Sequence, residues 1–169
     1  MEFKQRKLNR LFGFDYIDGC YFVTICVKDR KEFFGEIKNK EMILNKCGML
    51  VKQQWLWLKK NFYYVELYEF IIMPNHIHCL ISIDRSKSSD DVQEKINKKI
   101  LPLSNIVGAF KTTSSKLIHK NGFLNFNWQR SFFDRIIRNE KEMENIQNYI
   151  LNNPYNWEND RNNKDDLFM

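Results

Sequence analysis

The chain has 169 residues, of which 43% are hydrophobic and 15% aromatic, enough for one hydrophobic core but not for two independent ones. Lysine and arginine outnumber aspartate and glutamate by 27 to 21, which permits a nucleic-acid partner without establishing one. The sequence has no run of membrane-span length, no signal-peptide pattern and no CxxC pair, which argues against a membrane protein, a secreted protein or a disulfide framework and favours reduced cysteines in the cytoplasm.

The first part of the chain predicts a strand, a small hairpin and a helix. Residues 21–27 (YFVTICV) are β-branched and aromatic, as expected of a strand buried on both faces at its centre. Apolar residues on either side of the polar segment 38–41 predict a hairpin insertion. Asn45 can cap a following helix. One face of this helix, which we expect to face the core, has the helical spacing of Leu50, Val51, Gln54, Trp55 and Leu58.

The middle of the chain predicts a second hairpin. Residues 64–73 and 76–83 are two strand-like runs around Pro74-Asn75. This pair favours a turn because proline fixes φ and asparagine tolerates a left-handed backbone. The polar segment 84–99 that follows predicts a loop rather than a domain linker.

The last part of the chain predicts helix, strand and helix. An amphipathic helix follows Ser104 and ends near Gly122, and residues 126–137 return to strand character. The final helix begins around Asn139 and must end near Pro154, because proline cannot continue a helix.

This order of elements predicts an α+β protein with a ferredoxin-like split βαβ fold. Such a fold has a central antiparallel sheet with two helices on one face; here it carries a small hairpin insertion and an added C-terminal helix. We expect a basic N-terminal arm (1–20), one functional domain (21–157) and an acidic C-terminal tail (158–169).

Two histidines in one predicted strand form a candidate metal site. Side chains alternate along a strand, so His76 and His78 share one face while Ile77 points to the other. Neighbouring neutral imidazoles can bind one metal ion. The alternative is a hydrogen-bonded structural pair. The metal site is favoured because the chain has only three histidines and two of them directly follow the turn.

Two polar residues of the last helix could join this site. Tyr149 lies about 100° around the helix from Ile150, so its hydroxyl could reach a cleft, although a structural tyrosine is the more common role. Asn153 lies one turn later on the same face. Its amide oxygen could complete the metal site or only cap the helix, since Pro154 biases it away from helical geometry.

The motifs resemble a known family. The segments MPNHIHCLISI, FKTTSSKLI, WQRSFFDRIIRN and YILNNP are similar to those of the REP-associated tyrosine transposases, within the single-tyrosine HUH transposases, from Tyr21 to about Trp157. The resemblance implies that Tyr149 is a nucleophile facing His76 and His78. Related insertion-sequence transposases have a glutamine ligand one turn after the tyrosine, where this chain has Asn153.

The resemblance also implies a reaction and a substrate. The reaction cleaves and rejoins single-stranded or hairpin DNA through a covalent 5′-phosphotyrosine, with Mg²⁺ or Mn²⁺ as cofactor and a monomer or homodimer as the active form. A non-catalytic hairpin-binding module of DNA or RNA is the alternative. The basic residues that match the family's DNA-binding elements, or extend them as an N-terminal arm, are Lys4, Arg6, Lys7, Arg10, Lys111, Lys116, Arg130 and Arg138.

Overall fold

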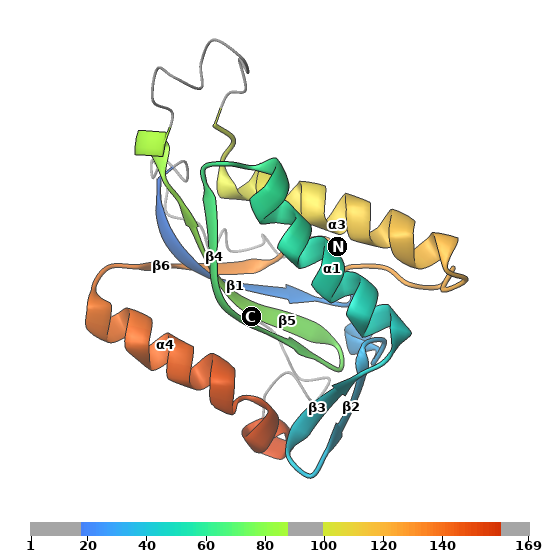
Figure 1. The fold of residues 1–169 in the computed structure, drawn as a ribbon. Coiled ribbons are helices and arrows are strands. Elements are labelled where there is room, and N and C mark those ends of the chain that lie inside the picture. The colour runs from blue at the N-terminus through green and yellow to red at the C-terminus, as the bar shows by residue number, and fades with distance from the viewer. Residues whose placement is uncertain (1–17, 88–99, 160–169) are drawn as a thin grey trace, which may run out of the picture.

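The computed structural model describes residues 18–87 and 100–159. Four strands form an antiparallel sheet in the order β4-β5-β1-β6. Two helices, α1 and α3, cover one face of this sheet, and α4 lies on the other (Figure 1). The sheet strands are β1 (Gly19–Cys26), β4 (Val65–Met73), β5 (His76–Ile83) and β6 (Phe133–Ile137), and the helices are α1 (Lys46–Asn61), α3 (Leu103–Lys120) and α4 (Glu140–Asn152).

The smaller elements extend this framework. The hairpin β2 (Gly35–Lys38) and β3 (Glu41–Leu44) is inserted between β1 and α1, and the 3-10 segments are η1 (Lys28–Arg30), η2 (Arg85–Lys87) and η3 (Pro154–Asn159). The predicted ferredoxin-like α+β fold, with its hairpin insertion and C-terminal helix, is confirmed. Almost all of the predicted arm, the tail and residues 88–99 of the loop lie outside the described residues.

Alternation along the strands produces two separate apolar layers. On β1, Tyr21, Val23 and Ile25 point into the large core beneath α1 and α3. Phe22 points the other way and packs with Leu80 of β5 and Ile150 of α4 in a smaller core. Odd and even positions of one strand therefore serve two different layers, which is why the runs are apolar almost throughout.

The cap predicted at Asn45 is present, and Asn139, around which the last helix was predicted to begin, is also a cap. The Asn45 side chain accepts a hydrogen bond from the Gly48 backbone amide at 3.0 Å, and Asn139 accepts one from Glu142 at 2.9 Å. Both asparagines occupy a donor that the first helical turn leaves unsatisfied. The helix expected after Ser104 instead begins at Leu103, directly after Pro102.

The strand predicted over residues 126–137 was too long. Strand β6 covers only Phe133–Ile137, and the preceding segment contributes one isolated bridge, Val27 to Trp128. The Lys111 ammonium donates to the backbone carbonyls of residues 129 and 131, at 2.9 and 3.0 Å. These carbonyls are thus satisfied by a side chain instead of a neighbouring strand.

None of the helices in the described part of the chain is long and apolar enough to cross a membrane. All four cysteines are free thiols, and burial raises the pKa of Cys20 and of Cys47 to about 11. The protonated thiol is therefore the form expected at neutral pH. The absence of a disulfide agrees with the sequence, while the cytoplasmic location stays a prediction.

Helix α4 packs on the sheet through the smaller core and through polar side-chain contacts. Ile150 is its one fully buried apolar residue. An ion pair joins Arg135 of β6 to Glu142 at 2.6 Å, and Gln147 donates to Glu69 of β4 at 2.8 Å. The Arg135 side chain of the ion pair is 62% exposed, so the pair stabilises the attachment only weakly, and Ile150 is the main anchor.

Replacing Ile150 with alanine should therefore loosen α4. We expect Ile150→Ala to lower the free energy of unfolding by about 2–5 kcal/mol, because it leaves a cavity beside Phe22 and Leu80. Urea unfolding followed by circular dichroism measures this change. The matched control is Leu151→Ala, since the Leu151 side chain is 65% exposed; equal stabilities for the two variants would contradict the assignment of Ile150 as anchor.

Candidate active site

The two histidines of β5 lie side by side on the sheet face that carries α4. Their ring centroids are 4.4 Å apart, and His76 and His78 are 0% and 2% exposed. Ile77 between them points into the opposite core. The predicted sharing of one face is therefore confirmed, and the site is enclosed between the sheet and the C-terminal elements.

Tyr149 brings its hydroxyl to these histidines from α4. The phenol oxygen lies 3.2 Å from Nε2 of His78, and the two ring centroids are 5.2 Å apart. Phe22 of β1 stacks on His78 and makes an edge contact with Tyr149. Tyr149 is also 42% exposed. The residue that contacts His78 is therefore accessible from solvent.

His76 is held as a neutral ring. Its Nδ1 lies 2.8 Å from Oδ1 of Asn75, while its Nε2 is buried with no hydrogen-bond partner among the described residues. Burial lowers the pKa of His76 well below its ordinary value, and the nearby charges of His78 and Arg30 lower this pKa further. Neutral imidazole is the form that binds metal ions, so the environment favours the ligand state.

Asn153 is buried at the end of α4, with 2% of its surface exposed. Its backbone is α-helical (φ −60°, ψ −43°), so the expected departure from helical geometry before Pro154 was wrong. The reason is that Pro154 starts a new 3-10 turn, η3. Within η3, the Trp157 ring stacks on His76 with centroids 6.0 Å apart. In the sequence, Asn153 thus lies between Tyr149, whose ring contacts His78, and Trp157, whose ring stacks on His76.

The four predicted DNA-binding residues that the structure describes do not gather at this site. Lys111 binds loop carbonyls, and Lys116 is exposed on α3, which covers the opposite face of the sheet. Arg130 is exposed in the segment before β6, and Arg138 is exposed where α4 begins. The candidates in the arm, Lys4, Arg6, Lys7 and Arg10, lie outside the described residues.

Sequence reasoning missed four residues around the histidines. Thr24 of β1 places its hydroxyl 2.8 Å from Nδ1 of His78, and it is the register partner of that histidine. Asn75, Phe22 and Trp157 contact the histidines as described above. Of these four, only Asn75 had a signal in the sequence, because it is adjacent to His76, but it was interpreted as a turn residue and its side chain was not considered. The other three are brought in by strand register and by the fold of η3.

The two imidazoles and the Asn153 amide oxygen are a chemically suitable set for a divalent ion. Within the described residues, no group of three histidine, cysteine, aspartate or glutamate side chains lies close enough to bind a metal. A site here would use two nitrogen ligands and leave positions open for substrate oxygen atoms, as catalytic sites do. The buried, unpartnered Nε2 of His76 fits such an ion, because a buried acceptor without a partner costs free energy.

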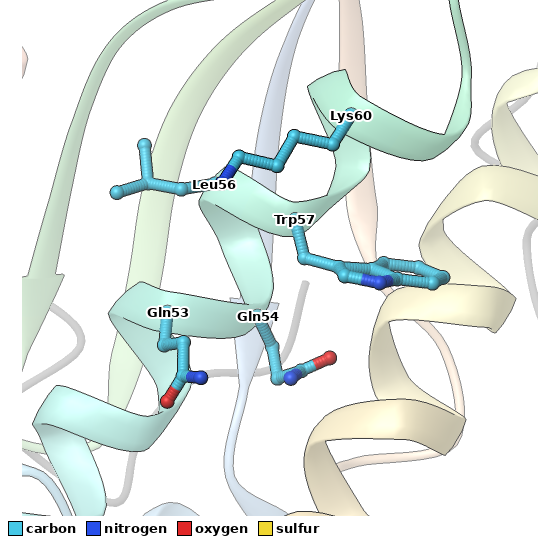
Figure 2. Close-up of a pocket in the computed structure, with 5 residues that line it drawn as sticks. All are labelled: Gln53, Gln54, Leu56, Trp57 and Lys60. Atoms are coloured by element: carbon cyan, nitrogen blue, oxygen red, sulfur yellow. The ribbon is translucent and has the colours of Figure 1, made fainter.

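A pocket elsewhere on the surface does not compete with this site. Five residues of α1 line it, Gln53, Gln54, Leu56, Trp57 and Lys60 (Figure 2). Helix α1 covers the sheet face opposite to the histidines (Figure 1). The lining has no histidine, carboxylate, cysteine or hydroxyl side chain, so we assign no chemistry to it.

Comparison with known proteins places the chain in a family. The family model described as "Transposase IS200 like" matches residues 18–153. The chain belongs to the IS200-like transposase family. The match covers every strand of the central sheet, both histidines, Tyr149 and Asn153, and it confirms the recognition made from the sequence motifs.

Individual relatives of this IS200-like transposase agree in sequence or fold. An uncharacterised protein of Haemophilus influenzae is 37% identical over 165 residues, covering 92% of each chain. A REP-associated tyrosine transposase solved with a REP hairpin shares the fold at 20% identity and a TM-score of 0.57, over 88% of this chain and 72% of that one. A protein of Deinococcus radiodurans proposed to be a transposase matches at 17% identity and a TM-score of 0.50, over 85% and 95%.

Proposed function

We propose that this IS200-like transposase is a metal-dependent nuclease and strand transferase of the HUH type, in which Tyr149 attacks single-stranded or hairpin DNA. The observation that carries the proposal is the 3.2 Å contact between the Tyr149 hydroxyl and Nε2 of His78. It brings a nucleophile from α4 to the histidine pair on β5. We assign this activity to residues 21–157, a span that agrees with the family match to residues 18–153.

The chain's own residues account for how an ion would be held. His76 and His78 would bind it through Nε2, and the amide oxygen of Asn153 is the third candidate ligand. Mg²⁺ or Mn²⁺, when bound, withdraws charge from a non-bridging phosphate oxygen and makes phosphorus a better electrophile. Phe22 stacks on His78 and Trp157 stacks on His76, and these contacts restrict the orientation of the two imidazoles.

The proposed reaction conserves the energy of the broken bond. The phenol oxygen of Tyr149 forms a bond to phosphorus, and the bond from phosphorus to the preceding 3′ oxygen breaks. The products are a 5′-phosphotyrosine and a 3′-hydroxyl. The phenol loses one proton and the leaving 3′ oxygen gains one, so the step is balanced. Attack by a 3′-hydroxyl on the phosphotyrosine reverses these changes and reseals a strand without ATP.

The enzyme assay is direct. Purified protein is incubated with single-stranded and hairpin oligonucleotides in Mn²⁺ and separated on a denaturing gel, and the attached peptide is identified by mass spectrometry. We expect a covalent adduct on the peptide that contains Tyr149. Cleavage products without any protein-linked strand would rule out the phosphotyrosine mechanism.

Hairpin DNA is the proposed partner. The REP-associated transposase of similar fold is bound to a REP hairpin, and we propose that this chain belongs to that branch and binds such hairpins too. The residues proposed to contact DNA are Lys116, Arg130, Arg138 and the arm residues. Lys111 would act indirectly, by binding the backbone carbonyls of the loop at residues 129–131. Since these cations would neutralise phosphates, binding should release counterions.

The strength of hairpin binding should therefore fall steeply with salt. If four to six phosphates are contacted, raising NaCl from 50 to 200 mM should weaken binding by about 10²–10³-fold. Fluorescence anisotropy with a labelled hairpin measures the dissociation constant across this range. A dissociation constant independent of salt would contradict a phosphate-binding surface and favour a site without a nucleic-acid role.

A further inference from the structure

We propose that Asn75 is a positioning residue that fixes the hydrogen of His76 on Nδ1 and so directs the lone pair of Nε2 toward the ion site. The inference rests on the proposed function only in taking His76 as a ligand. It assigns a role to Asn75 and explains why His76 has the tautomer needed for metal binding already in the metal-free protein.

The orientation of the Asn75 amide follows from its two partners. Its nitrogen, Nδ2, lies 3.1 Å from the backbone carbonyl oxygen of Arg30, and its oxygen, Oδ1, lies 2.8 Å from Nδ1 of His76. A backbone carbonyl can only accept, so the NH₂ group must face Arg30. The amide oxygen therefore faces the histidine. Because this oxygen can only accept, Nδ1 of His76 must carry the hydrogen.

The consequence for His76 concerns its second nitrogen. A neutral imidazole carries one ring hydrogen, so a hydrogen on Nδ1 leaves Nε2 with an exposed lone pair. This nitrogen is the buried acceptor that has no hydrogen-bond partner among the described residues. Metal-binding histidines commonly donate their other N–H to an oxygen acceptor, which fixes tautomer and ring orientation. Asn75 supplies that acceptor.

Backbone hydrogen bonds join the turn at Pro74-Asn75 to the loop that contains Arg30, and they do not involve the Asn75 side chain. The backbone amide of Val27 donates to the Asn75 carbonyl at 2.8 Å, and the amides of Phe33 and Phe34 donate to the Pro74 carbonyl at 2.9 and 3.0 Å. These bonds tie the turn to the loop that contains Arg30. Arg30 itself has a left-handed φ of 53°, a costly conformation for a non-glycine residue that persists only where its surroundings impose it.

The backbone of the turn does not explain why asparagine is present. Positive φ among the described non-glycine residues occurs at Asp29, Arg30, Asn39 and Lys40, and not at Asn75. The turn predicted at Pro74-Asn75 is present, but it does not use the tolerance of asparagine for a left-handed backbone. Asn75 is only 2% exposed. Its side chain links the loop to the histidine, and a turn alone would not require such a link.

His78 is held differently. Its Nδ1 faces the hydroxyl of Thr24, which can either donate or accept a hydrogen. Thr24 is thus compatible with both tautomers of His78, whereas the amide of Asn75 permits one tautomer of His76. The two ligands should consequently behave differently in the metal-free protein.

Nitrogen NMR of the whole ¹⁵N-labelled chain tests the inference without metal or DNA. Long-range ¹H–¹⁵N spectra distinguish a ring hydrogen on Nδ1 from one on Nε2. We expect His76 to carry it on Nδ1 in the wild-type protein and to become a mixture of tautomers in Asn75→Ala. Calorimetric titration with Mn²⁺ should show an affinity about 10–100-fold lower for Asn75→Ala.

Asn45→Ala is the matched control. Its amide also donates to a backbone carbonyl of the same loop, that of Phe33 at 3.0 Å, but it contacts no histidine. We expect it to leave the His76 tautomer and the Mn²⁺ affinity unchanged. A wild-type His76 with its hydrogen on Nε2 would overturn the proposal whether or not any variant folds, as would an Asn75→Ala protein with wild-type tautomer and affinity. Failure of the proposed DNA chemistry would instead appear as a missing covalent adduct while the tautomer is as expected.

Discussion

Tyr149→Phe should abolish the covalent protein–DNA adduct while leaving hairpin binding intact. The substitution removes one oxygen atom, the one that lies 3.2 Å from His78, and keeps the ring that packs against Phe22. A phenyl ring has no nucleophile, so we expect no adduct above background on a denaturing gel. The dissociation constant for the hairpin, measured by anisotropy on the same preparation, should be close to that of the wild type.

Tyr155→Phe provides the control for this variant. Tyr155 is 62% exposed on η3, and its ring is covered by the ammonium group of Lys40, so loss of its hydroxyl should not affect the adduct. An undiminished adduct in Tyr149→Phe would eliminate Tyr149 as the nucleophile. Hairpin binding without an adduct in the wild-type protein would instead favour the non-catalytic module considered from the sequence.

Replacement of either strand histidine should remove metal-dependent cleavage. We expect His76→Ala and His78→Ala each to lower the cleavage rate by about 10²-fold or more, since stabilisation of the phosphate by the ion contributes several kcal/mol. Single-turnover cleavage of an oligonucleotide at saturating protein measures the rate. Removal of divalent ions by EDTA should have the same effect on the wild-type protein, and added Mn²⁺ should restore it.

The third histidine is the natural control. His119 lies on α3, where its Nε2 is 2.8 Å from the Phe126 carbonyl oxygen, on the far side of the sheet from the site. We expect His119→Ala to cleave at close to the wild-type rate after any loss of stability is accounted for. Full cleavage by the His76→Ala or His78→Ala protein, or by the wild type in chelator, would contradict the metal site.

Much of the fold could be predicted because local patterns and the final packing agree. The alternation of His76, Ile77 and His78 requires only the geometry of a strand, and the structure places these side chains as expected. The cap at Asn45 and the start of the last helix at Asn139 depend on hydrogen bonds within three residues. Such short-range features are fixed by the sequence nearby and do not depend on the rest of the chain.

Other features depend on residues far apart in the sequence. In the segment before β6, where a longer strand was predicted, Lys111 binds carbonyls 18 to 20 residues later in the chain. Thr24, which lies against Nδ1 of His78, is 54 residues away, and only the register of β1 on β5 brings them together. For Asn153 the local rule on residues before proline favoured an extended backbone, but the 3-10 turn that follows continues the helix.

The most direct test of the account is a crystal structure of the wild-type protein soaked with Mn²⁺, with the ion located by anomalous scattering. We predict a single strong peak within coordination distance of Nε2 of both His76 and His78, with the Tyr149 hydroxyl beside it. A peak bound elsewhere, or a Tyr149 side chain turned away from the two histidines, would contradict the proposed site.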